Sequence, residues 1–460
     1  MTAPDQLNIF GVTKHFFEGG RSEYVFSSSS RPEIRSIKHR DREELGLFAT
    51  RDYSEGDVLV VDNTIAGGVP VGRHRNRVCW NCFSFSSKMK VREGVEVCTY
   101  CSLKCMQDDA LFLERYGEAI QYIQQNNEKL VDAFSLVFRI LNKSGSEQIE
   151  QLKQLCVGSS VNTQVEEEET EMVNKVMKSN ILSCDVDALE LQHMLRIIRF
   201  NAQQLRLALK LTDTYIIVVM PILSRLNHSC CPNTILTAVP KSGGKVIVEA
   251  VACTCIKADQ ELRISYLRDI SMHIEMRVQL LKNFSFDCEC MRCMSEVADM
   301  VPVSKQSIES VHEAADALSS LSSNISTSML YAYQDIALEH INREDGPAAI
   351  AQDQLSSRRL ASYYILAQVS SNLGLRLATL SRIELLLAAC HCFLKTAVPS
   401  SVTVRDKQRA QFMAKEAADC LSILTKSWNK DKDDDSEKRH GILFDMLALA
   451  QQFRKVLLSE

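Results

Sequence analysis

The sequence predicts an α+β protein with several domains, because strand patterns and helix patterns occupy separate stretches of a 460-residue chain. At roughly 100–200 residues per domain, this length suggests two to four units. Short apolar runs between turn residues predict strands in the first and middle parts of the chain. Long alanine- and leucine-rich segments at helical spacing predict an all-α domain beyond about residue 300. Two groups of closely spaced cysteines predict metal binding.

The first β unit is predicted after an irregular N-terminal extension. Residues 1–44 show no consistent period, so we expect no regular structure there. From Leu45 to Val61, apolar residues alternate on both sides of the turn sequence Ser54-Glu55-Gly56-Asp57. Alternation on both sides of such a turn predicts a β-hairpin.

A predicted helical insertion separates this hairpin from the remaining strands. Residues 110–155 carry apolar side chains at helical spacing, and a further helix is predicted from about 186 to 211. Between these helices, residues 159–170 contain four consecutive glutamates and few apolar groups, which predicts a solvated linker. The strands predicted next are 215–223, 245–250 and 261–266.

The C-terminal part of the sequence predicts helices alone. Gly374, Pro399 and the charge run 430–436 divide it into segments. The predicted helices are at about residues 326–343, 354–373, 376–396, 404–427 and 438–458. We expect an all-α, solenoid-like domain, although no clean repeat consensus is present.

The composition is typical of a soluble globular protein, with 45% hydrophobic and 24% charged residues. The most apolar run, 215–223, is shorter than the roughly 18 residues of a membrane span, so no membrane helix is expected. No secretory signal is predicted, which indicates a reducing compartment and hence a cytoplasmic or nuclear location, or both. A net charge of −5 gives no general attraction to phosphate backbones, so nucleic acid is not an expected partner.

The second cysteine group has the spacing of metal ligands. Cys288, Cys290 and Cys293 lie within six residues, and tetrahedral zinc needs one further nitrogen or sulfur ligand. Cys230 is the natural candidate, because it would pin the polar loop 227–233 against this segment. The alternative is a set of buried free thiols, which is improbable for three cysteines so close together in a reducing compartment.

The first cysteine group contains five candidates for one four-thiolate site. Its members are Cys79, Cys82, Cys98, Cys101 and Cys105. A generic two-knuckle zinc spacing is matched by Cys79, Cys82, Cys98 and Cys101. A zinc site could equally be formed with Cys105 in place of Cys98. Spacing alone does not choose between these two sets.

Four motifs, in this order, resemble the SET-domain protein lysine methyltransferases. They are Leu45-Gly46-Leu47-Phe48-Ala49, Asn227-His228-Ser229-Cys230-x-Pro232-Asn233, Glu261-Leu262-x-Ile264-Ser265-Tyr266 and Phe286-Asp287-Cys288-x-Cys290-x-x-Cys293. The cysteine-rich insertion after the first motif and the helical C-terminus are similar to the SET-and-MYND subfamily. A single motif would be weak, whereas the ordered set is specific and covers roughly residues 45–295.

The resemblance implies a β-rich SET core, an inserted MYND-like zinc finger, a helical insertion, a post-SET zinc site and an all-α C-terminal domain. The implied units are an irregular N-terminal extension (1–44), the first part of the SET domain (45–78), a degenerate MYND-like finger (79–105), a helical insertion (106–211), the SET core (212–270), a post-SET zinc-binding segment (271–296) and a helical C-terminal domain (297–460).

The implied activity is methyl transfer from S-adenosylmethionine to a lysine of a substrate protein, histone or non-histone. By resemblance, the residues that bind the cofactor are Asn201, Asn227, His228, Phe286 and Gly46. Tyr266 takes the catalytic place, where its hydroxyl would align the amine that receives the methyl group. Three of these residues could instead have an ordinary structural role. Asn227 could be a turn residue, Tyr266 a strand aromatic and Asn201 a polar helix residue.

The sequence departs from the family pattern at three places: the first motif, the second finger site and the glycine-rich approach to the Asn227-His228 pair, which is replaced by residues 214–220. The first motif usually reads Gly-x-Gly-Leu with a basic middle residue, whereas this chain has Glu44-Leu45-Gly46, and backbone without glycine approaches a ligand less closely. By resemblance, the first finger site uses Cys79, Cys82, Cys101 and Cys105, whereas the last two ligands of a second site would fall at Leu113 and Gly117. We therefore expect one zinc ion in the finger and two in the chain, with Cys98 as a spare or alternative ligand.

A second class of function is a catalytically weak or inactive adaptor that keeps the SET and MYND fold. The altered hairpin at Glu44 to Gly46 favours the adaptor, and the intact Asn227-His228 pair and Tyr266 favour the enzyme. Protein partners could bind through the finger or the helical C-terminal domain. A basic rim surrounds the finger, but exposed charge is normal around a small zinc module.

Overall fold

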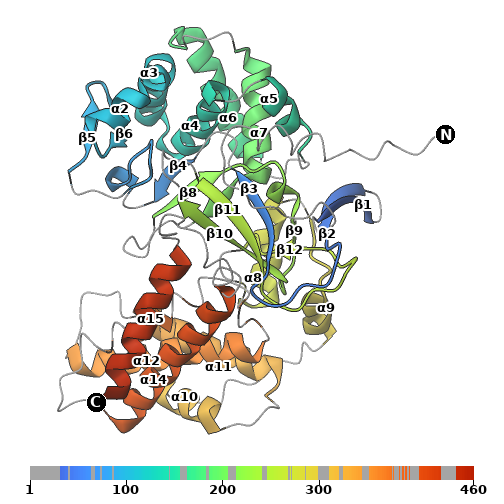
Figure 1. The fold of residues 1–460 in the computed structure, drawn as a ribbon, viewed down its shortest axis with the longest axis vertical. Coiled ribbons are helices and arrows are strands. Elements are labelled where there is room, and N and C mark those ends of the chain that lie inside the picture. The colour runs from blue at the N-terminus through green and yellow to red at the C-terminus, as the bar shows by residue number, and fades with distance from the viewer. Residues whose placement is uncertain are drawn as a thin grey trace, which may run out of the picture.

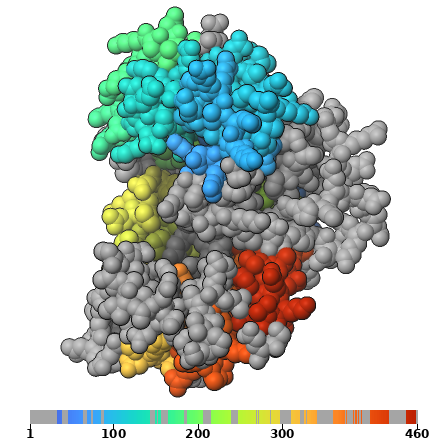
Figure 2. All heavy atoms as spheres, turned by 90° about the vertical axis from the view of Figure 1, so that its left-hand side faces the viewer, coloured from blue at the N-terminus to red at the C-terminus, as the bar shows by residue number. Residues whose placement is uncertain are grey.

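The computed structural model shows a mixed α+β protein with several small sheets. The described residues are 32–39, 42–63, 68–72, 75–84, 88–143, 146–155, 163–182, 186–205, 214–240, 246–267, 270, 272–284, 286–298, 310–320, 325–343, 352–373, 375, 377, 383, 386–387, 389–390, 393, 403–425 and 442–459. Most strands lie in the middle of the molecule, between helices from the first half of the chain and the C-terminal helices (Figure 1). Figure 2 shows the same two helical regions from the side, with the yellow part of the chain between them.

Two three-stranded antiparallel sheets form the centre of the strand region. One has the order β10 (Thr234–Pro240), β11 (Val246–Ala252), β3 (Val58–Asn63), and the other has the order β4 (Val69–Gly72), β8 (Thr214–Val218), β7 (Gln203–Leu205). Apolar side chains from both sheets, including Val248 and Ile216, belong to one core cluster. This cluster also contains Leu47 and Ile264, which flank the candidate site, so the site is built on packed strands.

The hairpin predicted for residues 45–61 is wrong in its pairing. The turn is present, with the backbone amide of Asp57 donating to the carbonyl of Ser54 at 3.1 Å. However, β2 (Arg42–Phe48) pairs with β1 (Glu33–His39), and β3 pairs with β11. Alternating apolar residues show that a segment is a strand but do not identify its partner.

The same pairing corrects the prediction that residues 1–44 are irregular. Strand β1 and the start of β2 are regular structure within residues 33–44. Beyond β2, the amide of Ala49 donates to the carbonyl of Gln260 at 2.9 Å, and the amide of Leu262 donates to the carbonyl of Leu47 at 2.7 Å. The first motif of the sequence therefore lies along the segment that leads to Tyr266.

Helices that follow the cysteine-rich hairpin in the chain form a separate apolar cluster with it. They are α2 (Leu103–Asp108), α3 (Ala110–Asn126), α4 (Val131–Lys143), α5 (Ser146–Lys153), α6 (Thr163–Ser179) and α7 (Ala188–Asn201), with 3-10 turns at Arg75–Arg77 and Glu128–Leu130. The hairpin consists of β5 (Lys90–Arg92) and β6 (Val95–Tyr100). Cys79 and Cys98 belong to this cluster, so the hairpin packs on the helices.

The solvated linker predicted at 159–170 is wrong from Thr163 onward, because α6 begins there. Val173 and Val176 on this helix are fully buried. The acidic residues that suggested a linker include Glu166 and Glu169, which form ion pairs with Arg199 of α7. A tertiary partner therefore stabilises charges that looked solvent-facing in the sequence.

The helix predicted to run to residue 211 is also shorter than expected. Helix α7 ends at Asn201, and the chain then enters β7. The strand predicted at 261–266 reduces to the two-residue β12 (Arg263–Ile264), and Glu261 forms an isolated β-bridge with Phe48.

A buried ion pair joins α4 to the junction between α2 and α3, and the end of the cysteine hairpin hydrogen-bonds to it. The Arg139 guanidinium binds both carboxylate oxygens of Asp109, and the Tyr100 hydroxyl donates to the same carboxylate at 2.7 Å. The guanidinium also lies 3.8 Å from the centre of the Phe112 ring. Arg139 and Asp109 are almost completely buried, so each needs the other to remain charged.

The C-terminal region is helical throughout its described residues. Its helices are α10 (Val311–Ser320), α11 (Thr327–Arg343), α12 (Gln352–Asn372), α14 (Val404–Leu424) and α15 (Ile442–Ser459). We call them the C-terminal helices. Four match predicted helices, α10 was not predicted, and most of the predicted helix 376–396 lies outside the described residues. No helix in the described part of the chain is long and apolar enough to cross a membrane.

We expect Asp109→Ala to lower the free energy of unfolding by about 3 kcal/mol, because it leaves the Arg139 charge buried without a partner. The matched control is Asp108→Ala, since Asp108 is the exposed neighbour at the end of α2. Chemical denaturation of both variants measures the difference. Equal stability of the two variants would contradict the role given to this ion pair.

Candidate functional site

The polar loop and the tyrosine motif lie side by side. Strand β9 (Asn227–His228) pairs with β12 in parallel, with Asn227 opposite Arg263 and His228 opposite Ile264. The amide of Ser229 donates to the carbonyl of Ile264 at 2.9 Å, which continues the pairing. Just before β9, the short 3-10 turn Leu223–Arg225 brings the chain into the loop. Two motifs more than thirty residues apart in sequence thus form one structural unit.

Gly46 allows β2 to pack directly against Asn227. A Cβ atom at Gly46 would lie 2.5 Å from Ile37 Cδ1, 3.0 Å from Glu261 Oε1 and 3.2 Å from Asn227 Nδ2. A side chain at this position would therefore displace its neighbours. Close approach of the backbone, rather than an unusual backbone angle, is the reason for glycine here.

The Asn227 carboxamide is held by an acidic side chain. Its Nδ2 donates to Glu261 Oε1 at 2.9 Å and has a longer contact of 3.4 Å with the carbonyl of Leu45. Glu261 also forms an ion pair with Arg263. Because the amide hydrogens face Glu261, the Asn227 Oδ1 atom remains the acceptor for a ligand.

His228 joins the loop to both the tyrosine segment and a cysteine. Its Nδ1 accepts a hydrogen bond from the backbone amide of Tyr266 at 2.9 Å, so the ring hydrogen belongs on Nε2. Nε2 lies 3.3 Å from Cys230 Sγ and can donate to it. Burial lowers the pKa of His228 to about 4, so the imidazole is neutral at pH 7.

Aromatic rings surround Tyr266. The centre of its ring lies 5.2 Å from that of Phe284, 5.4 Å from that of His228 and 6.1 Å from that of Phe286. The Tyr266 hydroxyl donates to the carbonyl of Leu226 at 2.9 Å. The hydroxyl is thus fixed beside the loop in a setting of ring faces and edges, which suits an apolar or cationic group.

Asn201 is buried at the end of α7. Its Nδ2 donates to the carbonyl of Ile197 at 2.8 Å, and its own carbonyl accepts a hydrogen bond from Ser224 Oγ at 3.1 Å. Ser224 lies three residues before Asn227, so Asn201 connects α7 to the segment that enters the loop. This position is consistent with a supporting role as well as with the predicted cofactor contact.

Cys230 lies with the three downstream cysteines. The Sγ atoms of Cys230, Cys288, Cys290 and Cys293 are all within 4.8 Å of one another. Hydrogen bonds from neighbouring thiols, chiefly Cys230, lower the pKa of Cys293 to about 7. Four sulfur donors around one point match the donor set of a structural zinc ion, and all four positions would be filled by protein.

The finger cysteines form a second group of the same kind. Cys79, Cys82, Cys101 and Cys105 have all their Sγ atoms within 4.8 Å of one another. Hydrogen bonding, chiefly from Cys79, lowers the pKa of Cys82 to about 4, as suits a metal ligand. Cys98 lies outside this group, and burial raises the pKa of its thiol to about 12. The tertiary structure thus chooses between two sets that spacing left equal.

Apolar packing occupies the place where a second finger site would require ligands. Leu113 is buried, and a Cβ atom at Gly117 would lie 2.9 Å from Val95 Cγ2. Helix α3 therefore approaches β6 too closely for a metal ligand at Gly117. Packing and the Arg139–Asp109 ion pair hold this side of the finger.

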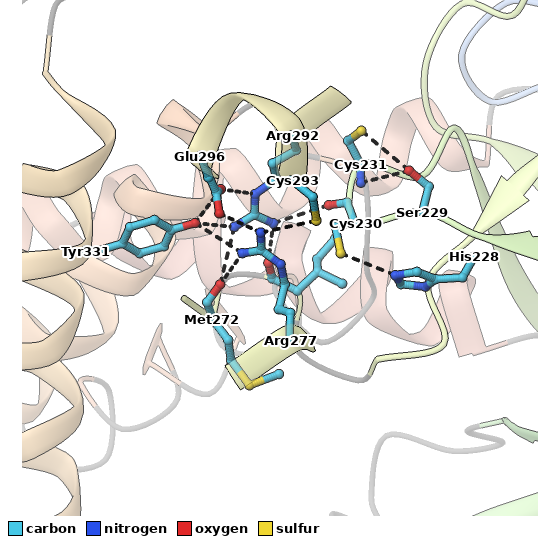
Figure 3. Close-up of polar contacts among 11 residues, drawn as sticks. His228, Ser229, Cys230, Cys231, Met272, Arg277, Arg292, Cys293, Glu296 and Tyr331 are labelled. Atoms are coloured by element: carbon cyan, nitrogen blue, oxygen red, sulfur yellow. Dashed lines mark hydrogen bonds and ion pairs between the residues drawn. The ribbon is translucent and has the colours of Figure 1, made fainter. Parts of the chain in front are cut away.

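Sequence reasoning missed several residues that the structure brings to the site. Glu261 was part of a recognised motif but had no assigned role, and Phe284 is two residues from Phe286. Arg277, Arg292, Glu296 and Tyr331 form a polar network behind the cysteine group (Figure 3). Only the position of Arg292 between Cys290 and Cys293 could have suggested it, because Tyr331 resembles any other residue of an amphipathic helix.

Comparisons with known proteins find partial sequence similarity to several methyltransferases. No protein family model matches the chain. Histone-lysine N-methyltransferase SMYD3 of Homo sapiens is 25% identical over 293 residues, or 58% of this chain and 64% of that protein. Histone-lysine N-methyltransferase ASHR1 of Arabidopsis thaliana is 22% identical over 263 residues, or 54% of this chain and 52% of that protein.

A shorter and more similar match is SET domain and MYND-type zinc finger protein 6 of Schizosaccharomyces pombe, which is 42% identical over 76 residues, or 16% of this chain and 14% of that protein. The chain spans less than two thirds of the length of each of these relatives. The fold and the two cysteine groups define a mixed α+β protein equipped to bind zinc. The matches are to proteins named as SET and MYND proteins or as histone-lysine N-methyltransferases, and at this low identity they support a similarity to the SET-and-MYND family.

We expect elemental analysis of the purified protein to find two zinc ions per chain, one for each cysteine group. Cys101→Ser should reduce the content to one ion, because it removes a finger ligand. The matched control Cys98→Ser should keep two, because Cys98 is outside the group. Three ions in the unaltered protein, or loss of zinc from Cys98→Ser, would refute this assignment.

Proposed function

We propose that this protein is a protein-lysine N-methyltransferase that uses S-adenosylmethionine. The proposal rests on one observation: Gly46 packs against the Asn227 side chain, while the next residue, His228, accepts the Tyr266 amide and packs against the Tyr266 ring. These are residues that the family resemblance implies for cofactor binding and catalysis. The relatives named as histone-lysine N-methyltransferases support the same activity.

S-adenosylmethionine would supply an electrophilic methyl group on a sulfonium centre. In this chain, Asn227 would bind its amino-acid end through Oδ1, because Glu261 already occupies the amide hydrogens. The His228 backbone and the Phe286 ring would contact the adenine end, with Asn201 as a further polar contact. Gly46 would keep the β2 backbone close to Asn227, at the amino-acid end of the cofactor.

Tyr266 would act on the lysine amine. In-line methyl transfer depends mainly on alignment and on exclusion of water, and a hydroxyl fixed by the Leu226 carbonyl is suited to alignment. The amine must first be neutral, since a lysine with a reference pKa near 10.4 is protonated in water. Burial of the amine beside the Tyr266, Phe284 and Phe286 rings would lower its pKa.

The two zinc ions would have structural tasks. At the second group, Cys230 belongs to the same loop as Asn227 and His228, so zinc would fix the loop to the segment that carries Phe286. A site with four protein ligands has no open position for a reactant. We therefore assign catalysis to the side chains and not to the metal.

The wider organisation follows from the same proposal. A SET core (45–78 and 212–270) would contain the finger (79–105) and helical insertion (106–211), followed by the post-SET segment (271–296) and the C-terminal domain (297–460). The substrate would be a histone or non-histone protein in the cytoplasm or nucleus. Further protein partners would bind through the finger or the C-terminal helices.

An adaptor without catalysis is the second candidate. Leu45 replaces the basic residue usual between two glycines, and Glu44 replaces the first glycine. Leu45 is uncharged and its side chain is exposed, so the positive charge usual at this position is missing. The altered residues Glu44 and Leu45 would weaken cofactor binding. Cofactor binding is therefore the property that distinguishes the enzyme from the adaptor.

We expect calorimetry of the zinc-loaded protein to show saturable binding of S-adenosylmethionine. Tyr266→Phe should keep this binding and lose most methyl transfer to a protein substrate, because only the hydroxyl is removed. Tyr53→Phe is the control, since Tyr53 is a buried tyrosine of the same core cluster. Absence of cofactor binding would eliminate the enzyme and leave the adaptor, whereas unchanged transfer by Tyr266→Phe would remove Tyr266 from the mechanism.

We expect Gly46→Ala to weaken binding of S-adenosylmethionine by roughly tenfold or more, because the added methyl would press on Ile37, Glu261 and Asn227 and shift the Asn227 side chain. Leu45→Ala changes the exposed neighbour in the same strand and should bind the cofactor as the parent does. Calorimetric titration of both variants makes the comparison. Equal affinities would show that close approach at Gly46 does not matter for the cofactor.

A further inference from the structure

A compact ionic network lies behind the second cysteine group. Glu296 accepts hydrogen bonds from Arg277 Nη2 at 2.5 Å and from Arg292 Nε at 2.6 Å. All three side chains are at most 8% exposed. Arg277 comes from α8 (Ile274–Leu281), and Arg292 and Glu296 come from α9 (Met291–Ala298), so the network ties these two helices together (Figure 3).

Tyr331 of α11 completes the network from the C-terminal helices. Its hydroxyl donates to Glu296 Oε1 at 2.5 Å and accepts hydrogen bonds from Arg292 Nη2 at 2.7 Å and Arg277 Nη1 at 3.2 Å. One hydroxyl thus contacts all three charged groups. Figure 3 shows it entering from the side opposite His228.

The two arginines connect this network to the cysteine group and its loop. Arg292 Nη1 donates to the carbonyl of Cys230 at 3.2 Å, and Arg277 Nη2 lies 3.7 Å from Cys293 Sγ. Arg292 and Arg277 also bind the carbonyls of Ile270 and Met272, respectively, which fixes the segment after Tyr266. The network therefore holds the backbone on both sides of the candidate site.

The charges of the two groups are complementary. Two guanidinium groups and one carboxylate leave a surplus of one positive charge in a buried place. Four thiolates around a divalent zinc ion carry a net charge of minus two. A buried cation needs a nearby anion, and the zinc–thiolate group would supply one, because Arg277 contacts the sulfur of Cys293.

We propose that Tyr331 is a positioning residue of the second zinc site, through which the C-terminal helices control how firmly zinc and the Asn227-His228 loop are held. This inference rests on the zinc site of the proposed function, but it does not depend on methyl transfer. Groups in the outer layer of metal sites orient the ligands and tune metal affinity. The outer layer of this site would be incomplete without a residue from α11.

The test measures zinc release from the full-length protein in the presence of a chelating dye. Tyr331→Phe keeps the ring and removes the hydroxyl, and it should release one of two zinc ions about tenfold faster than the parent. The other zinc ion, in the finger, should leave at the parental rate. Native mass spectrometry counts the ions, and hydrogen exchange of residues 286–298 shows which site has opened.

Tyr364→Phe is the matched control. Tyr364 is also a buried tyrosine of the C-terminal helices, and its hydroxyl accepts hydrogen bonds from Ser319 at 3.0 Å and Gln368 at 2.9 Å, within those helices. It should leave both release rates unchanged. Glu296→Gln provides a second variant, which should also accelerate loss of one ion because it removes the shared carboxylate.

The outcomes separate this inference from the zinc assignment itself. Parental release rates in Tyr331→Phe and Glu296→Gln would overturn the inference while leaving zinc in place. Equal acceleration of both ions, or the same effect in Tyr364→Phe, would also overturn it, because the change would then be general destabilisation. Parent protein with no zinc at the Cys230 group would refute the proposed site before any variant is compared.

Discussion

The neutral imidazole of His228 joins the two halves of the site. One ring nitrogen accepts the Tyr266 amide, and the other faces the Cys230 sulfur. Burial keeps the ring uncharged, so its two nitrogens can have opposite roles, one as acceptor and one as donor. The position of Tyr266 therefore depends on a loop that is itself fixed by a cysteine group. Proposed catalysis and proposed metal binding share this one side chain.

The protein holds its two cysteine-rich modules with different combinations of forces. At the finger, four thiols form one group, while Arg139, Asp109 and apolar packing stabilise the opposite side. At the second group, buried arginines lie directly behind the thiols. At the finger cysteines, a buried ion pair and close helix packing occupy the place where a second metal site would require ligands. The Arg277–Glu296 ion pair differs from the Arg139–Asp109 pair, because it lies directly beside a cysteine of the second group.

The sequence indicated which segments carry the chemistry better than it indicated how strands and helices pair. The motifs containing Asn227, Tyr266 and Cys288 could be recognised from their residue types and their order in the sequence. In the structure they lie together. The pairing of β2 with β1 was missed, since alternating apolar residues do not identify a partner strand. Helix α6 was missed because its glutamates find a partner in Arg199, which is distant in sequence.

Sequence alone determined the residue types available for the site: the cysteine spacing, the Asn227-His228 pair, Tyr266 and the glycine at position 46. Only the tertiary structure decided which four finger cysteines meet, that Glu261 holds Asn227, and that Tyr331 reaches the second cysteine group. The physical reason is that ligand spacing and side-chain chemistry are local properties of the chain. Burial, the pairing of charges and the choice of tautomer depend on neighbours that folding brings from distant segments.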